Sequence, residues 1–310
     1  MWLAAAILPE ENARKTPRGV HKFVLCFVEC LHYALPVAST TSGLTVKGKV
    51  ADFWNSEPCG TRYLAGESVF ETQARIRYQL EPHIRRFAGF SKAHGKWVLE
   101  IGVGIGADYE QWLRSGALAT GIDISGYSLE VARKRCDAAG LHHDLYQADA
   151  ENLPFAAESF DLIYSYGVMH HSSDTATCID EAWRVLKPGG EARIMLYQHP
   201  SITGLMLWLR HGWWRGQSIR ACVYQRLESP GTKTFTREEV LALMRRFESV
   251  TIEQVFSPGD LLLHAPSSRY CGVVYRAAWK LFPRRLIRRF GRRWGLFLLI
   301  SGTKSESFTP

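Results

Sequence analysis

The stretch VLEIGVGIGAD at residues 98–108 constrains the fold of this chain more than any other. It begins as an apolar, strand-like run, passes through Gly102, Gly104 and Gly106, and enters the helix-compatible segment DYEQWLRSG. A strand that runs through glycines into a helix brings bare backbone N–H groups and a helix N-terminus close to a ligand. Glu100 would add a carboxylate to the same crevice. The spacing is GxGxG rather than the GxGxxG of dinucleotide folds, so it also fits a tight strand-to-helix turn without a ligand.

Strand-like and helix-like segments alternate along the middle of the chain. Strands are expected at 97–102, 117–125, 143–150, 160–168 and 191–197, with helices at 107–115, 127–140 and 174–186. The segment Lys187-Pro188-Gly189-Gly190 is expected to stop the last of these helices. This alternation predicts an α/β fold in which a mostly parallel, doubly wound sheet carries helices on both faces.

The 310 residues fit one α/β domain with added segments. We expect an N-terminal extension (1–47), a helical lid (48–95), the core (96–197) and a cap (198–235). Helices and strands would follow over 236–304, with a tail at 305–310. Within that last part, a capping box from Thr236 to Glu239 predicts a helix over 236–247, and strands are expected at 249–256 and 294–304.

The apolar segment 23–38 looks like the core of a signal peptide, but Glu29 and His32 interrupt it. A targeting segment, an extra helix and a start codon assigned too far upstream all remain open. No run of 18 uncharged apolar residues occurs, so no transmembrane helix is expected. The seven cysteines are scattered without a CxxC pair, which argues against a disulfide framework and a zinc cluster. We therefore expect a cytoplasmic protein without a metal.

The net charge of +8 is concentrated in residues 269–293, which hold nine Lys or Arg and no acid. Arginines alternate there with apolar residues. A solvated helix packed on the domain, a helix on an anionic membrane surface and a contact with RNA phosphates all fit this pattern. It leaves open a peripheral membrane contact through 276–294, while nucleic acid is the least favoured partner.

Polar residues stand at the predicted strand ends, where open α/β sheets bind ligands. Asp123 ends the second strand and can accept hydrogen bonds from ribose hydroxyls. Asp149 and Ala150 end the third, where an acid beside a free N–H suits an adenine. Ser165 and Tyr166 end the fourth strand, and His170 and His171 follow it.

Five segments in register, VLEIGVGIGAD, GIDIS, ADAENLPF, FDLIYSYGVMHH and RVLKPGGEARIMLY, resemble the class I S-adenosylmethionine-dependent methyltransferases. The likeness is to small-molecule enzymes of the ubiquinone/menaquinone methyltransferase-like group and covers about residues 95–200. It implies a Rossmann-like methyltransferase fold of seven strands in the order 3-2-1-4-5-7-6, with the seventh antiparallel. It implies S-adenosylmethionine as cofactor and S-adenosylhomocysteine as product.

The resemblance also assigns residues by position. Glu100, Gly102, Gly104 and Gly106 would hold the methionine end, Asp123 the ribose, and Asp149 and Ala150 the adenine. Ile124, Ser165 and Tyr166 are expected to bind the cofactor as well. Methyltransferases of nucleobase amino groups commonly have an Asn/Asp-Pro-Pro-aromatic turn after strand four. Ser-Tyr-Gly-Val stands there in this chain, which counts against nucleobase methylation.

Methyl transfer from a sulfonium is an in-line displacement, so the protein mainly supplies alignment and exclusion of water. A protonated acceptor also needs a base, for which His170 and His171 are the candidates. The alternative is that one of the pair packs against or caps the next helix. Candidate lid and substrate residues, each of which could equally serve ordinary packing, are Trp54, Tyr63, Tyr197, Trp208, Trp213 and Arg215.

The expected function is methylation of a small-molecule O, S or N acceptor, with a thiol or a phenolic or quinone-like metabolite as the favoured kinds. Two alternatives stay open: a methyltransferase acting on tRNA or protein, and a non-catalytic protein that binds S-adenosylmethionine. The sequence does not specify an oligomeric state.

Overall fold

The computed structural model describes residues 46–56, 69–229, 231–263 and 279–306. The chain divides into two units, Ser42–His264 with Phe282–Pro310, and Met1–Thr41 with Ala265–Leu281. Only residues 279–281 of the second unit are described, and the sheet with its helices belongs to the first. Tyr63, residues 1–45 of the expected extension and residues 307–310 of the tail lie outside the described residues.

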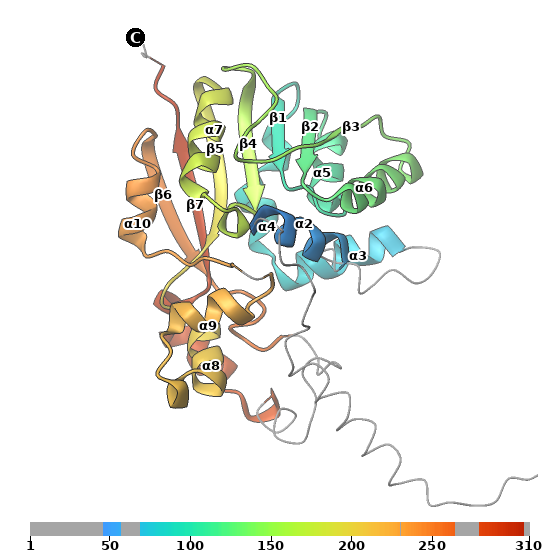
Figure 1. Cartoon of the computed structure of the whole chain (residues 1–310). Coiled ribbons are helices and arrows are strands. Elements are labelled where there is room, and N and C mark those ends of the chain that lie inside the picture. Colours follow the sequence, from blue (N-terminus) through green and yellow to red (C-terminus); the bar gives the residue numbers. More distant parts are fainter. Residues whose placement is uncertain (1–45, 57–68, 230, 264–278, 307–310) are drawn as a thin grey trace, which may run out of the picture. The chain divides into compact units, whose positions relative to one another are not determined.

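The first unit is built on a seven-stranded sheet with the order β3-β2-β1-β4-β5-β7-β6 (Figure 1). Its strands are β1 (Trp97–Ile101), β2 (Leu118–Asp123), β3 (Asp144–Gln147), β4 (Phe160–Tyr166), β5 (Leu186–Tyr197), β6 (Glu248–Val255) and β7 (Phe297–Thr303). The first five are parallel, and β7 pairs antiparallel with both β5 and β6. The predicted order and the antiparallel seventh strand are confirmed.

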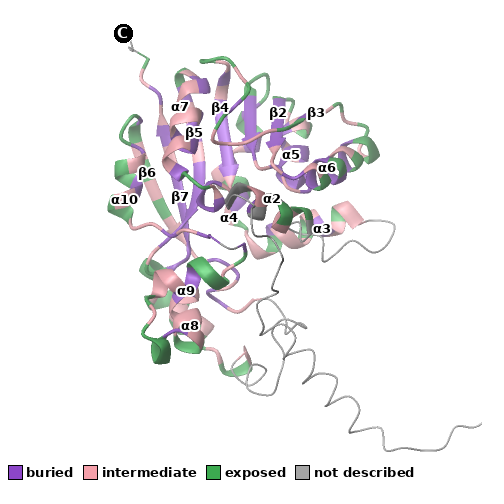
Figure 2. Cartoon of the chain, in the orientation of Figure 1, coloured by how far each residue is buried: buried purple, intermediate pink, exposed green. Residues whose placement is uncertain are grey.

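Helices cover both faces of this sheet because alternate strand residues bury apolar side chains on each side. One core cluster packs Trp112 of α5 (Ala107–Arg114) and Leu129 of α6 (Gly126–Ala138) against β1, β2 and β4. The other packs Ile179 of α7 (Thr175–Val185) and Val240 of α10 (Arg237–Leu243) against the opposite face. Figure 2 shows the central strands buried between these helical layers. The doubly wound fold is confirmed.

Two boundaries differ from expectation. The strand β5 begins at Leu186, five residues earlier than expected, because Leu186 pairs with Phe160 and the register then shifts before Glu191 pairs with Leu162. The segment 187–190 therefore bends a strand instead of separating a helix from one. The helix α10 opens with the predicted capping box but ends at Leu243 instead of 247.

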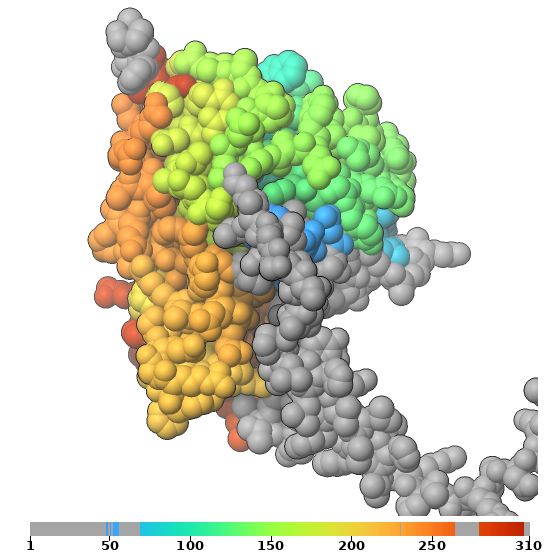
Figure 3. All heavy atoms as spheres, in the orientation of Figure 1, coloured from blue at the N-terminus to red at the C-terminus, as the bar shows by residue number. Residues whose placement is uncertain are grey.

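Helices precede and follow the core in the described residues. The N-terminal ones are α2 (Val46–Ser56), α3 (Val69–Leu80), α4 (His83–Ala88) and the short η2 (Phe90–Lys92). The cap holds α8 (Ile202–His211), the 3₁₀ turn η4 (Trp213–Arg215) and α9 (Ile219–Arg226). It lies beyond the end of β5, and its atoms continue the surface of the core in the space-filling view (Figures 1 and 3).

The basic segment does not form one long helix. Pro283 precedes the seven-residue α12 (Arg284–Phe290), and the 3₁₀ turn η5 (Arg292–Trp294) follows it. Leu286, Phe290 and Trp294 expose 58%, 70% and 45% of their surface among these arginines. Over the ranges that the structure describes, the helices are too short or too polar to cross a membrane.

Candidate active site

The three glycines after β1 have left-handed φ values of +81°, +53° and +81°. Gly102 packs so closely on Val168 that a β-carbon would collide with that side chain, and a β-carbon on Gly106 would lie 3.0 Å from Ala132 Cβ in α6. A β-carbon on Gly104 would meet no atom within 4 Å. Gly102 and Gly106 therefore close the turn, while Gly104 opens onto free space where a ligand can approach the backbone.

Glu100, next to last in β1, is 3% exposed, and its Oε2 atom has no hydrogen-bond partner among the described residues. Burial and then the Asp108 carboxylate raise the pKa of Glu100 well above its ordinary value, against the opposing effect of Arg77. A buried carboxylate oxygen without a donor costs free energy. A ligand that brings a donor, such as an ammonium group, would relieve this cost.

Asp123 ends β2 beside this turn. Its Oδ2 accepts the N–H of Gly104 and its Oδ1 accepts the N–H of Ser125, both at 2.8 Å. Burial raises the pKa of Asp123, and these backbone donors partly offset that effect. Each oxygen keeps a second lone pair, so the carboxylate is fixed in place with capacity left for two hydroxyl groups.

The end of β3 lies next in the sheet. Asp149 Oδ1 accepts the N–H of Glu151 at 2.9 Å in a turn, and the neighbouring Ala150 is half-buried against the core. The carbonyl of Ile124 accepts a hydrogen bond from Gln147 Nε2 at 3.0 Å. The structure thus brings the residues predicted for the methionine end, ribose and adenine to the ends of three adjacent strands, β1, β2 and β3.

The two residues at the end of β4 behave differently. Ser165 is fully buried and its Oγ has no partner within the described residues. The Tyr166 hydroxyl lies 2.7 Å from His83 Nε2, and its ring packs against Phe297 and under the guanidinium of Arg77. Neighbouring strand residues point to opposite faces of a sheet, so Ser165 and Tyr166 lie on different sides. Tyr166 contacts residues of α3, α4 and β7 on its side.

Helix α2 contacts the ends of β2 and β4. Ser125, the N-cap of α6, donates through its hydroxyl to Asn55 Oδ1 at 2.7 Å. The Trp54 ring meets the His171 ring edge-on at 5.3 Å between centroids. In Figure 1 the helix lies at the end of the sheet toward which the β4 arrow points. This is the position that a lid over the strand ends requires.

The histidine pair lies on η3 (Met169–His171), directly after β4. His170 is fully buried and stacks on Tyr197 at 3.8 Å between ring centroids. The backbone of Met195 approaches His170 but does not meet hydrogen-bond geometry, so neither ring nitrogen has a partner in the described part of the chain. Burial, followed by the nearby His171 and Lys233, lowers the pKa of His170 well below its ordinary value.

His171 is held from both sides. Its Nδ1 atom lies 2.8 Å from Ser229 Oγ and 3.1 Å from Thr232 Oγ1, and its Nε2 atom lies 3.2 Å from Glu228 Oε2. The Tyr197 hydroxyl donates to the same Glu228 oxygen at 2.8 Å. The site therefore joins a loop after β4, the end of β5 and a turn after α9.

Sequence reasoning does not identify Glu228, Ser229 and Thr232. They lie in the segment LESPGTKT, whose composition signals only a turn. Two structural features mark them: Ser229 and Thr232 are polar yet at most 1% exposed, and Glu228 has a left-handed φ of +57°. A single sequence does not reveal that this turn folds back onto His171.

Of the predicted cap residues, the structure brings only Tyr197 to the histidines. Trp208 Nε1 donates to the Gln217 carbonyl at 2.7 Å within the cap. Trp213 is 59% exposed, and Arg215 lies over the ring of Trp214. No ring contact of the described residues joins these three predicted residues to the histidine pair.

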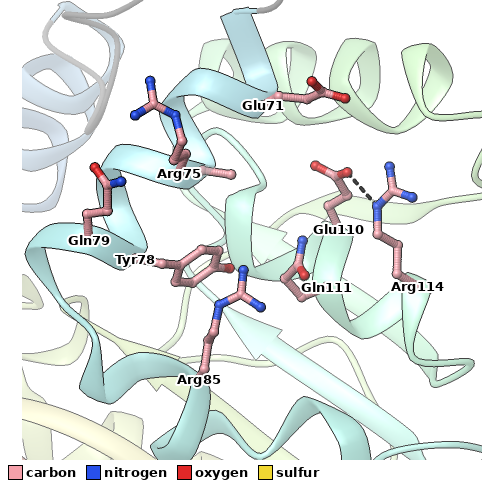
Figure 4. Close-up of a pocket in the computed structure, with 9 residues that line it drawn as sticks. Glu71, Arg75, Tyr78, Gln79, Arg85, Glu110, Gln111 and Arg114 are labelled. Atoms are coloured by element: carbon pink, nitrogen blue, oxygen red, sulfur yellow. Dashed lines mark hydrogen bonds and ion pairs between the residues drawn. The ribbon is translucent and has the colours of Figure 1, made fainter.

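A separate hollow of about 550 Å³ lies between α3, α4 and α5 (Figure 4). Basic side chains (Arg75, Arg85 and Arg114) and acidic ones (Glu71 and Glu110) line it together, and Glu110 pairs with Arg114 at 2.7 Å. It contains none of the predicted site residues. Its mixed charge favours neither an anionic nor a cationic ligand.

Comparisons with known proteins agree with this geometry. Residues 99–194 match the family model described as a methyltransferase domain. A 106-residue stretch is 37% identical to a demethylmenaquinone methyltransferase of Tropheryma whipplei and covers 34% of this chain and 44% of that protein. A 101-residue stretch is 38% identical to a ubiquinone biosynthesis O-methyltransferase of Actinobacillus pleuropneumoniae. It covers 31% of this chain and 43% of that protein. The chain thus spans less than half the length of these curated relatives.

Among solved structures, the chain is similar to a geranyl diphosphate C-methyltransferase from Streptomyces coelicolor, in complex with Mg²⁺, geranyl diphosphate and S-adenosylhomocysteine. The TM-score is 0.57 at 16% identity, over 84% of this chain and 99% of that one. At this identity the likeness shows a shared fold.

Proposed function

We propose that this chain, whose residues 99–194 match a methyltransferase-domain model, is a class I methyltransferase that transfers a methyl group from S-adenosylmethionine to an O, S or N atom of a small molecule. The observation that carries the proposal is the pair formed by the unpartnered, buried Oε2 of Glu100 and the open face of Gly104. The first calls for a hydrogen-bond donor, and the second leaves room for a ligand beside the backbone.

The remaining strand ends complete the cofactor site. Asp123 would hold the ribose hydroxyls, and Asp149 with Ala150 the adenine. When bound, S-adenosylmethionine supplies an activated methyl group on a sulfonium. The chain would contribute orientation and the exclusion of water, with Trp54 and Asn55 of α2 closing the strand ends.

The histidine pair adjoins this site because Val168, two residues before His170, packs on Gly102. An acceptor placed between the strand ends and the pair would meet the aromatic surfaces of Trp54 and Tyr197. His171 would stand ready to take its proton. Aromatic walls beside a proton acceptor support a phenolic, quinone-like or thiol acceptor. The names of the curated relatives, which include quinone-pathway methyltransferases, point the same way.

Two measurements test the proposal. Isothermal titration of the full chain with S-adenosylhomocysteine should show one site, which Glu100→Ala abolishes while the far-ultraviolet circular dichroism is unchanged. Incubation with methyl-labelled donor and cell extract should then label a small molecule. Absence of any binding would overturn the proposal. Label in RNA or protein would favour the macromolecular alternative, and binding without any labelled product would favour the non-catalytic one.

Peripheral membrane contact through residues 276–294 stays a prediction. The exposed Leu286, Phe290 and Trp294 lie among arginines of α12 and η5, which suits an anionic surface. Flotation with anionic liposomes at low salt tests it, with Arg288→Glu/Arg289→Glu as the disrupting variant. If the unchanged chain fails to float, the prediction is wrong.

A further inference from the structure

The cluster around His171 has an unbalanced set of hydrogen-bonding groups. The Thr232 hydroxyl donates to the carbonyls of Leu227 and Ser229, each at 2.7 Å. It has one proton and that proton is engaged, so toward His171 Nδ1 the hydroxyl acts as an acceptor. In the tautomer with the proton on Nδ1, Thr232 Oγ1 and Ser229 Oγ accept that proton, and Nε2 of the neutral ring is a bare lone pair.

That lone pair faces another acceptor. His171 Nε2 lies 3.2 Å from Glu228 Oε2, which already accepts the Tyr197 hydroxyl proton. Beside them, His170 is fully buried with both ring nitrogens unpartnered among the described residues. One nitrogen from each of two histidines and a carboxylate oxygen thus lie close together, an arrangement that a cation can bridge.

The neighbouring lysine does not supply this positive charge. The Lys233 ammonium donates to the carbonyls of Ser172 at 2.6 Å and Ser173 at 2.8 Å. It is therefore engaged at the end of η3.

We propose that His170, His171 and Glu228 form a binding site for a divalent transition-metal ion of the Zn²⁺ type. One ligand atom from each lies within 4.8 Å of the other two. Two imidazoles and a carboxylate are the ligands that such ions prefer, and a fourth position is left for a substrate atom. Zinc bonds of about 2.1 Å put tetrahedral ligands roughly 3.4 Å apart, so the three side chains close in slightly on binding.

The surroundings have the features of a metal site. Ser229 and Thr232 fix the orientation of the His171 ring, as outer residues do for metal-bound histidines. Tyr197 orients the Glu228 carboxylate. Glu228 is 42% exposed, which gives an ion a path from solvent.

The role of the ion rests on the proposed methyl transfer, although the binding site does not. With an ion bound, His171 would be a ligand and would no longer act as the base. An acceptor hydroxyl or thiol in the open position would instead lose its proton to solvent more easily, since the ion stabilises the anion. The acceptor's lone pair then forms the bond to the methyl carbon, and the electrons of the broken S–CH₃ bond stay on sulfur. The cluster would thereby select acceptors that can bind a metal through O or S.

The test uses the full chain, stripped with chelator and dialysed against micromolar Zn²⁺, with bound zinc measured by mass spectrometry. We expect one zinc per chain, and Co²⁺ in its place should give the visible absorption of a low-symmetry site. Glu228→Gln keeps the shape of a partly exposed side chain and should remove the bound metal. Thr232→Val should weaken binding by about 10–100-fold, as loss of an outer partner does.

The chain carries a matched control. His142 and His143 stack on the surface, and His143 Nε2 lies 3.4 Å from Asp137 Oδ1. His143→Ala/Asp137→Asn should leave the zinc content unchanged. Zinc lost in this control would place the metal at the surface pair, and no zinc in the unchanged chain would show that the cluster binds none; either result overturns the proposal.

Titration with S-adenosylhomocysteine separates the two proposals. Glu228→Gln should lose zinc and keep this binding, which also shows that it is folded. If the unchanged chain binds zinc but not S-adenosylhomocysteine, the metal site stands and the methyltransferase proposal fails.

Discussion

Arg77 and Asp108 are joined by two hydrogen bonds, Nε to Oδ1 at 3.1 Å and Nη2 to Oδ2 at 2.6 Å, which tie α3 to the first turn of α5. Asp108 is 3% exposed and also accepts the hydroxyl protons of Tyr78 and Tyr164. Burial alone would raise the pKa of Asp108, but these three partners together hold it below its ordinary value. The N-terminal helices are thus fastened to the core by one ionised, fully partnered carboxylate.

Asp108→Asn should lower the free energy of unfolding by about 3 kcal/mol, because it removes the carboxylate charge that Arg77 contacts most closely and leaves only Glu81, at 4.0 Å. Urea denaturation at pH 7 measures this. Glu253→Gln is the control, since its 2.6 Å pair with Arg86 is about half exposed and should contribute less than about 1 kcal/mol. If the two substitutions lowered the free energy of unfolding equally, Asp108 would not be the carboxylate that fastens the N-terminal helices to the core.

Glu81 should make the stability depend on pH near neutrality. Burial raises the pKa of Glu81 from 4.5 to about 7, although the charge of Arg77 opposes this shift. Between these values the folded chain keeps a proton that the unfolded chain has lost, so stability falls as pH rises through this window and levels off above it.

Glu81→Gln should remove this dependence. Relative to the unchanged chain, the variant should gain about 2–3 kcal/mol between pH 4.5 and pH 8. Parallel urea titrations at several pH values give the difference directly. Parallel stability curves for the two proteins would show that Glu81 titrates normally.

Alanine substitutions at two glycines of the turn after β1 should affect different properties, stability at Gly102 and ligand affinity at Gly104. Gly102→Ala collides with Val168 at a left-handed φ and should cost about 2–4 kcal/mol of stability. Gly104→Ala meets no atom and should cost about 1 kcal/mol, yet weaken S-adenosylhomocysteine binding about tenfold or more. Thermal unfolding and calorimetric titration measure the two effects. Unchanged affinity in Gly104→Ala would place the ligand elsewhere.

Asn55→Ala should loosen the lid, because it removes the acceptor of the 2.7 Å bond from Ser125. We expect S-adenosylhomocysteine to dissociate faster by about 3–10-fold, the worth of roughly one hydrogen bond. Stopped-flow fluorescence measures the rate. Asp52→Ala, on the exposed side of the same helix, should not change it.

Much of the fold follows from local patterns. The apolar periods of five strands, the capping box at Thr236 and the glycine turn each act over a few residues, so sequence alone identifies them. The helix before Lys187 ends within one residue of the expected position, at Val185. The strand expected from Glu191 begins earlier, because pairing of Leu186 with Phe160 outweighs the local preference of proline and glycine.

The candidate site also contains residues that the sequence predicts and residues that it does not. Glu100, Asp123 and Asp149 are predictable because strand ends gather at one edge of a parallel sheet. Glu228 and Thr232 are not, since their role depends on a turn that returns to His171 some sixty residues away in sequence. Trp213 and Arg215 are attractive by residue type, but the cap turns them to its surface.

The place of β7 in the sheet has a consequence for how the chain is made. It lies between β5 and β6, although it is the last strand in sequence. From the end of β5 at Tyr197 to the end of β7 at Thr303 is 303 − 197 = 106 residues. A ribosome adds about 5–20 residues per second, so β5 waits roughly 5–20 s with one side unpaired. During this time its unpaired backbone N–H and C=O groups are open to neighbouring nascent chains, and the yield of folded protein should depend on chaperones that shield them.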